Sequence, residues 1–190
     1  SAMQFKNDGS PINENTPFYA SSAYSAERIY SVYLSRYYRD KFNLKTYVGY
    51  LFNHDSPFRS ENHVNQKIVK SAINIANGSK EKLFVGDFDV KKEFNYAGDI
   101  VNAIWKLVSQ NDISEIVIGS GEAFSIQTWI EYCFKMAGLK WEEHVVKDEN
   151  FIADYNVLVS DPTLLRSIGY IPSKDIFQLA DIMLKSAYIK

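Results

Sequence analysis

Apolar residues recur along much of the chain at the three- and four-residue steps of an amphipathic helix. The longest example begins at Ser21 or Ser22, a suitable N-cap, and continues to about Phe42, before Asn43. Its apolar positions include Ile29, Val32, Tyr33 and Tyr37. The same periodicity, together with capping residues, predicts further helices at 64–76, 98–110, 125–137, 162–168 and 175–187.

Short β-forming runs separate these helices. The run 46–53 contains too few polar residues for an exposed strand, so we expect a strand covered on both faces. Further strands are predicted at 82–86, 115–118, 141–146 and 157–159. Segments 3–17 and 53–62 are polar and rich in turn residues, which is typical of loops. The alternation of strands and helices predicts an α/β fold with a partly parallel sheet.

The composition is that of one globular domain. The chain has 190 residues, of which 46% are hydrophobic, enough to fill a single core. We take 3–190 as that domain, and residues 1–2, which precede Met3, as a cloning remnant. The 21 basic and 23 acidic residues leave a formal charge of -2, which predicts no binding to nucleic acid.

Cysteine and hydropathy indicate the compartment. The single cysteine, Cys133, lies in a helical run and is expected to be a buried thiol in a reducing environment. No apolar stretch approaches the roughly 18 residues that a membrane span requires, and no signal peptide opens the chain. These features predict a cytoplasmic protein without a membrane partner. No His, Cys and carboxylate set has ligand spacing, so no metal site is predicted.

A glycine-rich turn between the first strand and helix of a doubly wound domain would indicate dinucleotide binding, and none opens this chain. The nearest candidate, Gly119-Ser120-Gly121, lacks a third glycine and comes late in the sequence. We interpret it as an ordinary strand-to-helix turn. The N-terminal dinucleotide-binding half is therefore expected to be absent.

Three sequence blocks resemble the GDP-mannose 4,6-dehydratases, which are extended short-chain dehydrogenases/reductases of the NAD-dependent epimerase/dehydratase family. Block 15–28 contains Thr-Pro-Phe-Tyr and leads into the position of a Tyr-x-x-x-Lys motif. Block 51–57 reads Leu-Phe-Asn-His-Asp-Ser-Pro, and block 86–94 is similar to the family's Gly-Asn-x-Asp-x-Lys-Arg-Asp-Trp. A weaker match, Ser160-Asp161-Pro162-Thr163, lies near the end, so the resemblance covers about 3–187. It implies a substrate-binding lobe plus the last strands and helices of a Rossmann-type sheet.

The resemblance implies that Tyr24 and Arg28 are the catalytic and cofactor-binding residues. In the family, tyrosine acts on the sugar 4-hydroxyl while NAD(P) takes hydride from C4; the 6-hydroxyl then leaves as water and hydride returns to C6. A phenol with an ordinary pKa near 10 acts as a base near neutral pH only beside positive charge. Arg28 stands where the family has lysine, and its planar guanidinium does not reproduce the compact contact of an ammonium with the nicotinamide ribose. Without the resemblance, Tyr24 would be an aromatic residue at a helix start and Arg28 a solvated charge.

The resemblance also implies a substrate-binding set consisting of Asn53, Lys67 and Lys92. Cationic donors and amides suit the diphosphate of a nucleotide-sugar, and a GDP-sugar is favoured. Lys92 stands where the family has arginine, and Phe151 stands where a second family arginine would contact phosphate or ribose. Considered alone, Lys67 and Lys92 would be surface lysines, and Asn53 could equally cap a turn.

The expected function is that of a sugar-nucleotide 4,6-dehydratase fragment that does not turn over alone. The cofactor of the complete enzyme is NAD(P), and we expect this chain alone to bind none tightly. The helix at 21–42 is expected to form a homodimer through an aromatic surface made by Tyr30, Tyr33, Leu34, Tyr37 and Tyr38. The alternative is a non-catalytic sugar-nucleotide-binding or protein-interaction module derived from the same family.

Overall fold

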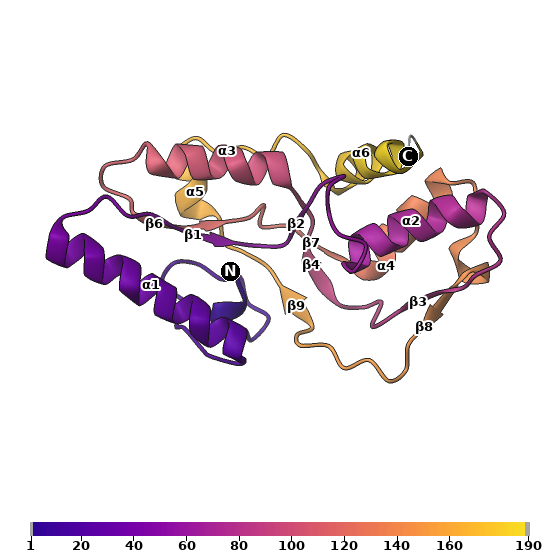
Figure 1. Cartoon of the computed structure of the whole chain (residues 1–190), viewed down its shortest axis with the longest axis horizontal. Helices are drawn as coiled ribbons and strands as arrows, with labels where there is room; N and C mark the ends of the chain where they lie inside the picture. Colours follow the sequence, from indigo (N-terminus) through magenta and orange to yellow (C-terminus); the bar gives the residue numbers. More distant parts are fainter. Residues whose placement is uncertain (1, 189–190) are drawn as a thin grey trace.

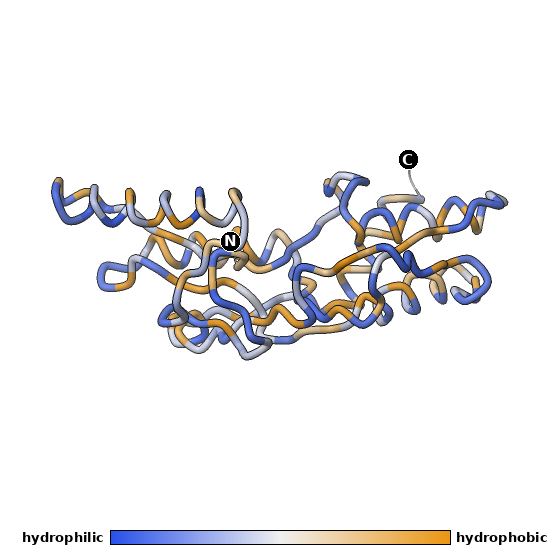
Figure 2. The backbone as a smooth tube through the Cα atoms, turned by 90° about the horizontal axis from the view of Figure 1, so that it is seen from below, coloured by the Kyte–Doolittle hydropathy of each residue, from blue (hydrophilic) through white to orange (hydrophobic). Residues whose placement is uncertain are grey.

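The computed structural model describes residues 2–188 and shows an elongated molecule with two lobes joined by a short central sheet (Figure 1). We call them the sheet lobe and the helical lobe. The chain passes between them several times, so both contain early and late segments of the sequence. Hydrophobic and hydrophilic stretches alternate along the helices of both lobes (Figure 2).

The sheet lobe is built on two parallel strands, β1 (Val48–Leu51) and β6 (Glu115–Ile118), paired from Val48 with Glu115 to Leu51 with Ile118. Its remaining elements are η1 (Ala2–Gln4), α1 (Ala23–Phe42), α3 (Ala97–Val108) and α5 (Thr163–Ser167). The helices α1 and α3 lie on opposite sides of the strands (Figure 1). Serine capping explains where α1 begins, since Ser22 and Ser25 form a reciprocal capping box.

The helical lobe encloses the largest core. Three helices, α2 (Val64–Ala76), α4 (Ile126–Met136) and α6 (Ile176–Tyr188), pack on one another and on the parallel strands β3 (Leu83–Val85) and β8 (Val145–Lys147). A short η2 turn (Trp141–Glu143) precedes β8. Trp129 is fully buried at the centre and stacks on Phe94, with ring centroids 5.1 Å apart.

The centre consists of β4 (Lys91–Glu93), flanked by antiparallel β7 (Ala123–Ser125) and parallel β9 (Val157–Leu158). The two-residue strands β2 (His54–Asp55) and β5 (Asn95–Tyr96) form a second parallel pair. Among the strands described for residues 2–188, only β4 and β7 pair antiparallel, which confirms the predicted α/β fold with a partly parallel sheet.

Some predicted elements differ from the structure. The predicted strand 141–146 is instead the η2 turn, closed by a 2.9 Å hydrogen bond from the His144 backbone nitrogen to the Trp141 backbone oxygen, followed by β8. The 119–121 turn leads from β6 into the short, unpredicted strand β7, and the helix predicted to follow the turn, α4, begins directly after that strand with Ser125 as its N-cap. Of β1, only Tyr50 is fully buried, which is less coverage than predicted.

The segment predicted as loop before the first long helix is largely irregular, yet Phe5 and Ile12 are buried in the sheet-lobe core. Cys133 is buried as predicted, and burial raises the pKa of its thiol. Ala2 is buried beside Phe5, and Ser1 lies outside the described residues. Among residues 2–188, no helix combines the length and the hydropathy that crossing a bilayer requires.

Candidate functional site

Two cavities lie next to each other where the lobes meet. The first, the tyrosine cavity, has a volume of about 410 Å³ and is lined by Tyr24, Arg28, Gly49, Leu51, Phe52, Asn53, His54 and Arg59. The second, the lysine cavity, has a volume of about 360 Å³, and its lining includes Lys67, Phe84, Gly86, Lys92, Phe151 and Tyr155. All five residues that the sequence analysis assigned to a site therefore line one of these two cavities.

Tyr24 and Arg28 lie one turn apart near the start of α1, so they share a helix face. The Arg28 guanidinium lies over the Tyr24 ring, 5.0 Å from its centroid, and Arg28 Nε is 3.4 Å from the Glu27 carboxylate. The Tyr24 side chain is 51% exposed and therefore open to a ligand. The positive charge of Arg28 is present at the tyrosine, but it faces the ring and is shared with Glu27.

A second guanidinium, that of Arg59, lines the same cavity and is held by an ion pair with Asp55. Its Nε lies 3.3 Å from the buried carboxylate of Asp55, which also accepts a hydrogen bond from Asn65 Nδ2 at 2.6 Å. Arg59 Nη2 lies 3.0 Å from His63 Nδ1, and burial together with the Arg59 charge lowers the pKa of His63. Arg59 therefore presents a fixed positive charge to the cavity.

Asn53 connects the two cavities. It lies between β1 and β2, and its backbone oxygen accepts hydrogen bonds from the backbone and side-chain nitrogens of Asn95. Its side-chain Nδ2 lies 3.4 Å from the hydroxyl of Tyr155, which lines the lysine cavity. This contact places an amide at the junction between the cavities.

Lys67 and Lys92 approach the lysine cavity from different elements. Lys67, on α2, donates a hydrogen bond of 2.9 Å to the backbone oxygen of Phe84. Lys92, on β4, is partly buried with its ammonium 5.3 Å from the centroid of the Phe94 ring. Burial lowers the pKa of Lys92 to about 8, with Asp55 acting in the opposite direction. A bound anion at Lys92 would offset the cost of burying this charge.

The 119–121 turn cannot bind a pyrophosphate in this structure, because its backbone donors already bind a carboxylate. Glu93 is fully buried, and its carboxylate accepts hydrogen bonds from the backbone nitrogens of Ser120 at 2.7 Å and Gly121 at 3.2 Å. The backbone nitrogen of Ser160 donates to the same carboxylate at 2.6 Å. This turn joins the central sheet to β6 and has a structural role.

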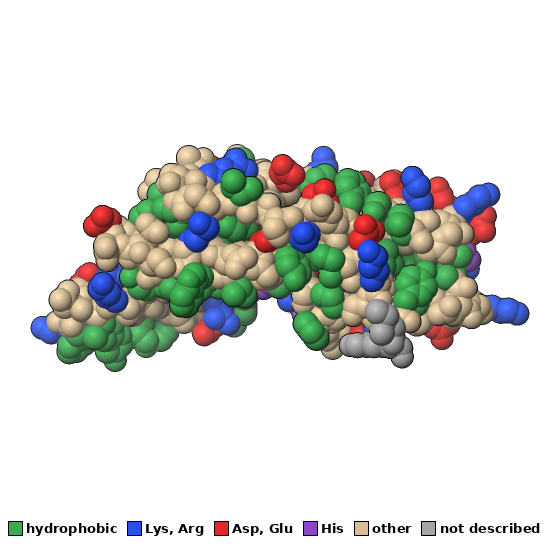
Figure 3. Space-filling model, turned by 90° about the horizontal axis from the view of Figure 1, so that it is seen from above, with side chains coloured by type: hydrophobic (Ala, Val, Ile, Leu, Met, Phe, Trp, Pro, Cys, Tyr) green, Lys and Arg blue, Asp and Glu red, His purple; other side chains and the backbone are tan. Residues whose placement is uncertain are grey.

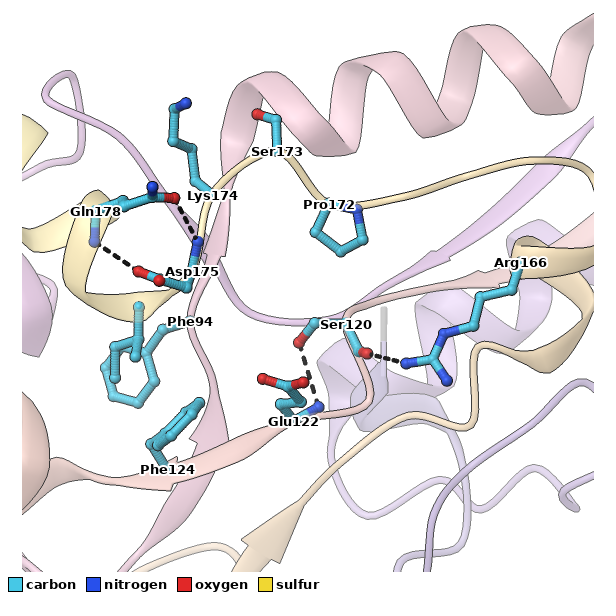
Figure 4. Close-up of a pocket in the computed structure, with 11 residues that line it drawn as sticks. Phe94, Ser120, Glu122, Phe124, Arg166, Pro172, Ser173, Lys174, Asp175 and Gln178 are labelled. Atoms are coloured by element: carbon cyan, nitrogen blue, oxygen red, sulfur yellow. Dashed lines mark hydrogen bonds between the residues drawn. The ribbon is translucent and has the colours of Figure 1, made fainter.

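A third cavity, of about 350 Å³, lies between β7 and the segment that leads into α6 (Figure 4). Its polar groups mostly bind one another: Arg166 Nη2 donates to the Ser120 backbone oxygen at 2.8 Å, and Asp175 and Gln178 cap the start of α6 reciprocally. None of the sequence-predicted site residues lines it. Its contacts stabilise the fold around the Ser120 turn.

Three residues of the two cavities and their surroundings were not predicted from the sequence: Asp55, Arg59 and Tyr155. A signal existed for the first pair, since Asp55 and Arg59 are four residues apart in block 51–57 and its extension. No local pattern could have placed Tyr155 beside Asn53, because the two are 102 residues apart in sequence. Within residues 2–188, no three His, Cys, Asp or Glu side chains form a group that could hold a metal ion.

Tyr24 and Arg28 are half-exposed and line one cavity, where they could contact a nicotinamide cofactor. A phenol and a guanidinium can both donate hydrogen bonds to the hydroxyl oxygens of a ribose. The described residues offer no free glycine-rich turn for the pyrophosphate of such a cofactor, because Glu93 binds the only Gly-x-Gly turn. The described residues thus fit the ribose of such a cofactor at Tyr24 and Arg28 and offer no open turn for its pyrophosphate.

Comparison with known proteins gives one consistent result. The family model described as GDP-mannose 4,6 dehydratase matches residues 5–183. "GDP-mannose 4,6 dehydratase 1" of Arabidopsis thaliana is 32% identical over 80% of this chain, and the match covers 42% of that protein. The human GDP-mannose 4,6 dehydratase is 35% identical over 74% of this chain and 37% of its own length. The chain thus spans less than half the length of these relatives.

Solved structures share the fold. A structure of RMD from Pseudomonas aeruginosa complexed with NADPH aligns over 98% of this chain and 63% of that chain, with a TM-score of 0.90 and 20% identity. The dTDP-glucose 4,6-dehydratase of Bacillus anthracis, in complex with NAD, covers 100% of this chain and 60% of its own, with a TM-score of 0.85 and 14% identity. Because the family model matches almost the whole length of this chain, the chain belongs to the GDP-mannose 4,6 dehydratase family.

Proposed function

We propose that this chain is the nucleotide-sugar-binding part of an NAD(P)-dependent sugar-nucleotide 4,6-dehydratase, a cytoplasmic lyase that acts on a GDP-sugar. The observation that carries this proposal is the pair of adjacent cavities. One contains Tyr24, the other contains Lys67 and Lys92, and Asn53 stands between them. This arrangement suits a ligand with a diphosphate at one end and a reacting sugar at the other.

The two lysines would bind the diphosphate. Lys67 is held by the Phe84 backbone oxygen, and Lys92 approaches from the central sheet, so their ammonium groups enter the cavity from different elements. Two cations can neutralise two phosphate charges, although lysine lacks the bidentate geometry of arginine. Asn53 would donate a hydrogen bond at the junction between phosphate and sugar.

Tyr24 would exchange a proton with the sugar 4-hydroxyl. Its phenol requires nearby positive charge to act near neutral pH, and the tyrosine cavity contains two guanidinium groups, those of Arg28 and Arg59. Arg28 lies against the tyrosine ring, and Arg59 is fixed by Asp55. A bound nicotinamide cofactor supplies the hydride acceptor and donor for the reaction.

We propose that this chain alone neither binds NAD(P) tightly nor turns over. An assay for release of a 4-keto-6-deoxy sugar nucleotide from GDP-mannose with NAD or NADP is therefore expected to give no product above background. Product formation by the purified chain would contradict this part of the proposal.

We further propose a homodimer through α1. Its outward face includes Tyr30, Tyr33, Leu34, Tyr37 and Tyr38, all of them exposed, and hydrophobic side chains gather over this helix in Figure 3. An aromatic surface of this kind is typical of the buried core of protein interfaces.

A second candidate function is a non-catalytic binding module, favoured by the state of Arg28. Because its guanidinium stacks on Tyr24 and is 3.4 Å from the Glu27 carboxylate, it lacks the free ammonium geometry of the lysine it replaces. The module keeps the lysine cavity but would have no use for the Tyr24 phenol.

Titration of the chain with GDP-mannose, UDP-glucose, CDP-glucose and dTDP-glucose, monitored by calorimetry, tests the shared part of both candidates. Saturable binding that is strongest for GDP-mannose is the expected result. Absence of binding to all four ligands would contradict both candidates. To separate them, Tyr24→Phe in a full-length enzyme that contains this segment should abolish turnover only if the site is catalytic.

A further inference from the structure

The Phe151 ring packs against Gly86 at the edge of the lysine cavity. A Cβ atom added at Gly86 would overlap the ring, so only glycine allows this contact. The Phe151 side chain is nevertheless 53% exposed, and the residue lines the cavity. One side of the ring is thus packed on the chain, and the ring remains open to a ligand.

The loop that carries Phe151 is held in place on both sides. Lys147 Nζ, at the end of β8, forms an ion pair of 2.9 Å with Asp87, the residue after Gly86. The backbone nitrogen of Phe151 donates to the Asp148 backbone oxygen at 3.1 Å, and the Asp148 side chain accepts from the backbone nitrogen of Asn150 at 3.0 Å. These contacts hold the loop in place before any ligand binds, which lowers the entropic cost of presenting the ring for stacking.

We propose that Phe151 is the stacking platform for the nucleobase of the bound nucleotide-sugar, with the base on the open side of the ring and the diphosphate directed toward Lys67 and Lys92. This inference rests on the proposed function and adds a residue that determines affinity for the base. Every base has a flat π-face, so an exposed aromatic ring beside two cations fits a nucleoside diphosphate.

The shape and lining of the cavity support a flat ligand at this position. Phe84 and Phe151 both line it, are both more than half exposed, and come from different segments of the helical lobe. Lys67 is tied to the Phe84 backbone oxygen, so a cation lies beside the aromatic wall. An apolar flat surface bordered by ammonium groups matches a base followed by phosphates.

The test compares the affinities of GDP-mannose, GDP and inorganic pyrophosphate for the wild-type chain and two variants. Phe151→Leu keeps apolar volume but removes the flat surface, and Phe151→Trp keeps a flat surface. Stacking of a base on an aromatic residue accounts for about a 5- to 150-fold effect on affinity. We expect Phe151→Leu to weaken GDP-mannose and GDP by about 5-fold or more, and Phe151→Trp to bind within about 3-fold of wild type.

Pyrophosphate distinguishes this inference from a general loss of the site. Phe151→Leu should leave its affinity unchanged, whereas Lys67→Ala should weaken all three ligands. As a control, Ile152→Ala changes an exposed neighbour that lies outside the lining of the cavity and should bind all three ligands like wild type.

Equal affinity of wild type and Phe151→Leu for GDP-mannose would overturn the platform and leave the proposed function intact. Failure of the wild-type chain to bind GDP-mannose would overturn both. An equal loss for pyrophosphate and GDP-mannose in Phe151→Leu would also overturn the platform, because stacking requires a base.

Discussion

The helical lobe and the sheet lobe are held together by different forces. In the helical lobe, α2, α4 and α6 share one apolar core, and Trp129 and Phe134 are completely buried in it. In the sheet lobe, Ser25 and Val32 are the only buried residues of the 20-residue α1. The first lobe thus has a closed core, whereas the second leaves a long aromatic helix exposed along one edge (Figures 2 and 3).

Under α1, polar contacts supplement a smaller apolar core that includes Val32 and Tyr50. Arg36 forms two hydrogen bonds with the Glu115 carboxylate, at 2.8 and 2.6 Å, and Arg39 forms a third at 3.1 Å. The Tyr50 hydroxyl donates to the same carboxylate at 2.6 Å. Although burial alone would raise it, these hydrogen bonds lower the pKa of Glu115 to about 2.

The sheet lobe has both an open strand edge and an exposed aromatic helix face. Within residues 2–188, β1 pairs with β6 alone, so its other edge has no strand partner, and the aromatic face of α1 lies on the same lobe. The sheet lobe thus combines an open strand edge with an exposed aromatic helix, whereas the lysine cavity is largely built by the helical lobe.

The largest expected effect comes from opening the closed core. Trp129→Ala removes the ring that stacks on Phe94 and the indole donor to the Asn65 backbone oxygen, and should lower the free energy of unfolding by about 3–5 kcal/mol. Trp105→Ala on α3 is the control, since Trp105 is 74% exposed and should cost less than about 0.5 kcal/mol. Urea denaturation measures both, and similar losses would contradict the contrast between the lobes.

Glu115→Gln should disturb the sheet lobe selectively. Because it removes the charged acceptor shared by Arg36, Arg39 and Tyr50, it is expected to cost about 2 kcal/mol at pH 7. Hydrogen exchange should then speed up in α1 more than in α2. The exposed Glu122→Gln is the matched control and should leave both helices unchanged.

The same carboxylate predicts the sign of acid sensitivity. The pKa of Glu115 is lower in the folded chain than in the unfolded chain, so its stabilisation is complete above about pH 4.5 and is lost as pH falls toward 2. Glu115→Gln lacks this contribution, so the stability difference between variant and wild type should shrink over that range. A difference that stays constant from pH 5 to 2.5 would refute the assignment.

Lys92→Met should stabilise the centre of the molecule at the expense of binding. Burial lowers the pKa of Lys92 to about 8 in the folded chain, so below that pH the side chain is charged and its burial destabilises the fold. Replacing it should raise the free energy of unfolding by about 1–2 kcal/mol at pH 7, with the gain vanishing as pH rises from 8 to 10.5. Urea denaturation at pH 7 and 10 measures the gain, and a pH-independent effect would argue against a buried ammonium.

The smallest effect on stability is expected from the aromatic face of α1. A Tyr30→Lys and Tyr37→Lys double variant changes two exposed side chains and should alter the free energy of unfolding by less than about 0.5 kcal/mol. Sedimentation should nevertheless show loss of the proposed dimer. A wild-type chain that is monomeric at high concentration would contradict the dimer proposal.

The sequence predicted helices far better than it predicted the central strands. Periodicity and caps placed 64–76 correctly as α2 and placed α1 to within two residues of its start. The strands β2, β4, β5 and β7 were missed, because each has only two or three residues and depends on partners distant in sequence. The local sequence pattern does not indicate with which distant segment such a short strand pairs.

In the candidate site too, individual positions were predicted, whereas contacts between distant segments were not. The positions of Tyr24, Asn53, Lys67 and Lys92 were predicted through the family resemblance, and the structure places all four around two adjacent cavities. Their partners could not be predicted, because the Asn53–Tyr155 contact and the Gly86–Phe151 packing join segments that are far apart in the chain. Only folding brings these groups together.

The most direct test of the proposed nucleotide-sugar site is calorimetric titration of GDP-mannose into the wild-type chain, Lys67→Ala and Lys70→Ala. Both variants remove one lysine from α2, but Lys67 lines the cavity, whereas Lys70 pairs with Glu61 outside it. We predict saturable binding by the wild type and Lys70→Ala, and an affinity at least about 10-fold weaker for Lys67→Ala, since a charge-assisted hydrogen bond is worth about 1.5–3 kcal/mol. Equal affinity of the two variants, or no binding by the wild type, would contradict the assignment of this cavity to a nucleotide-sugar.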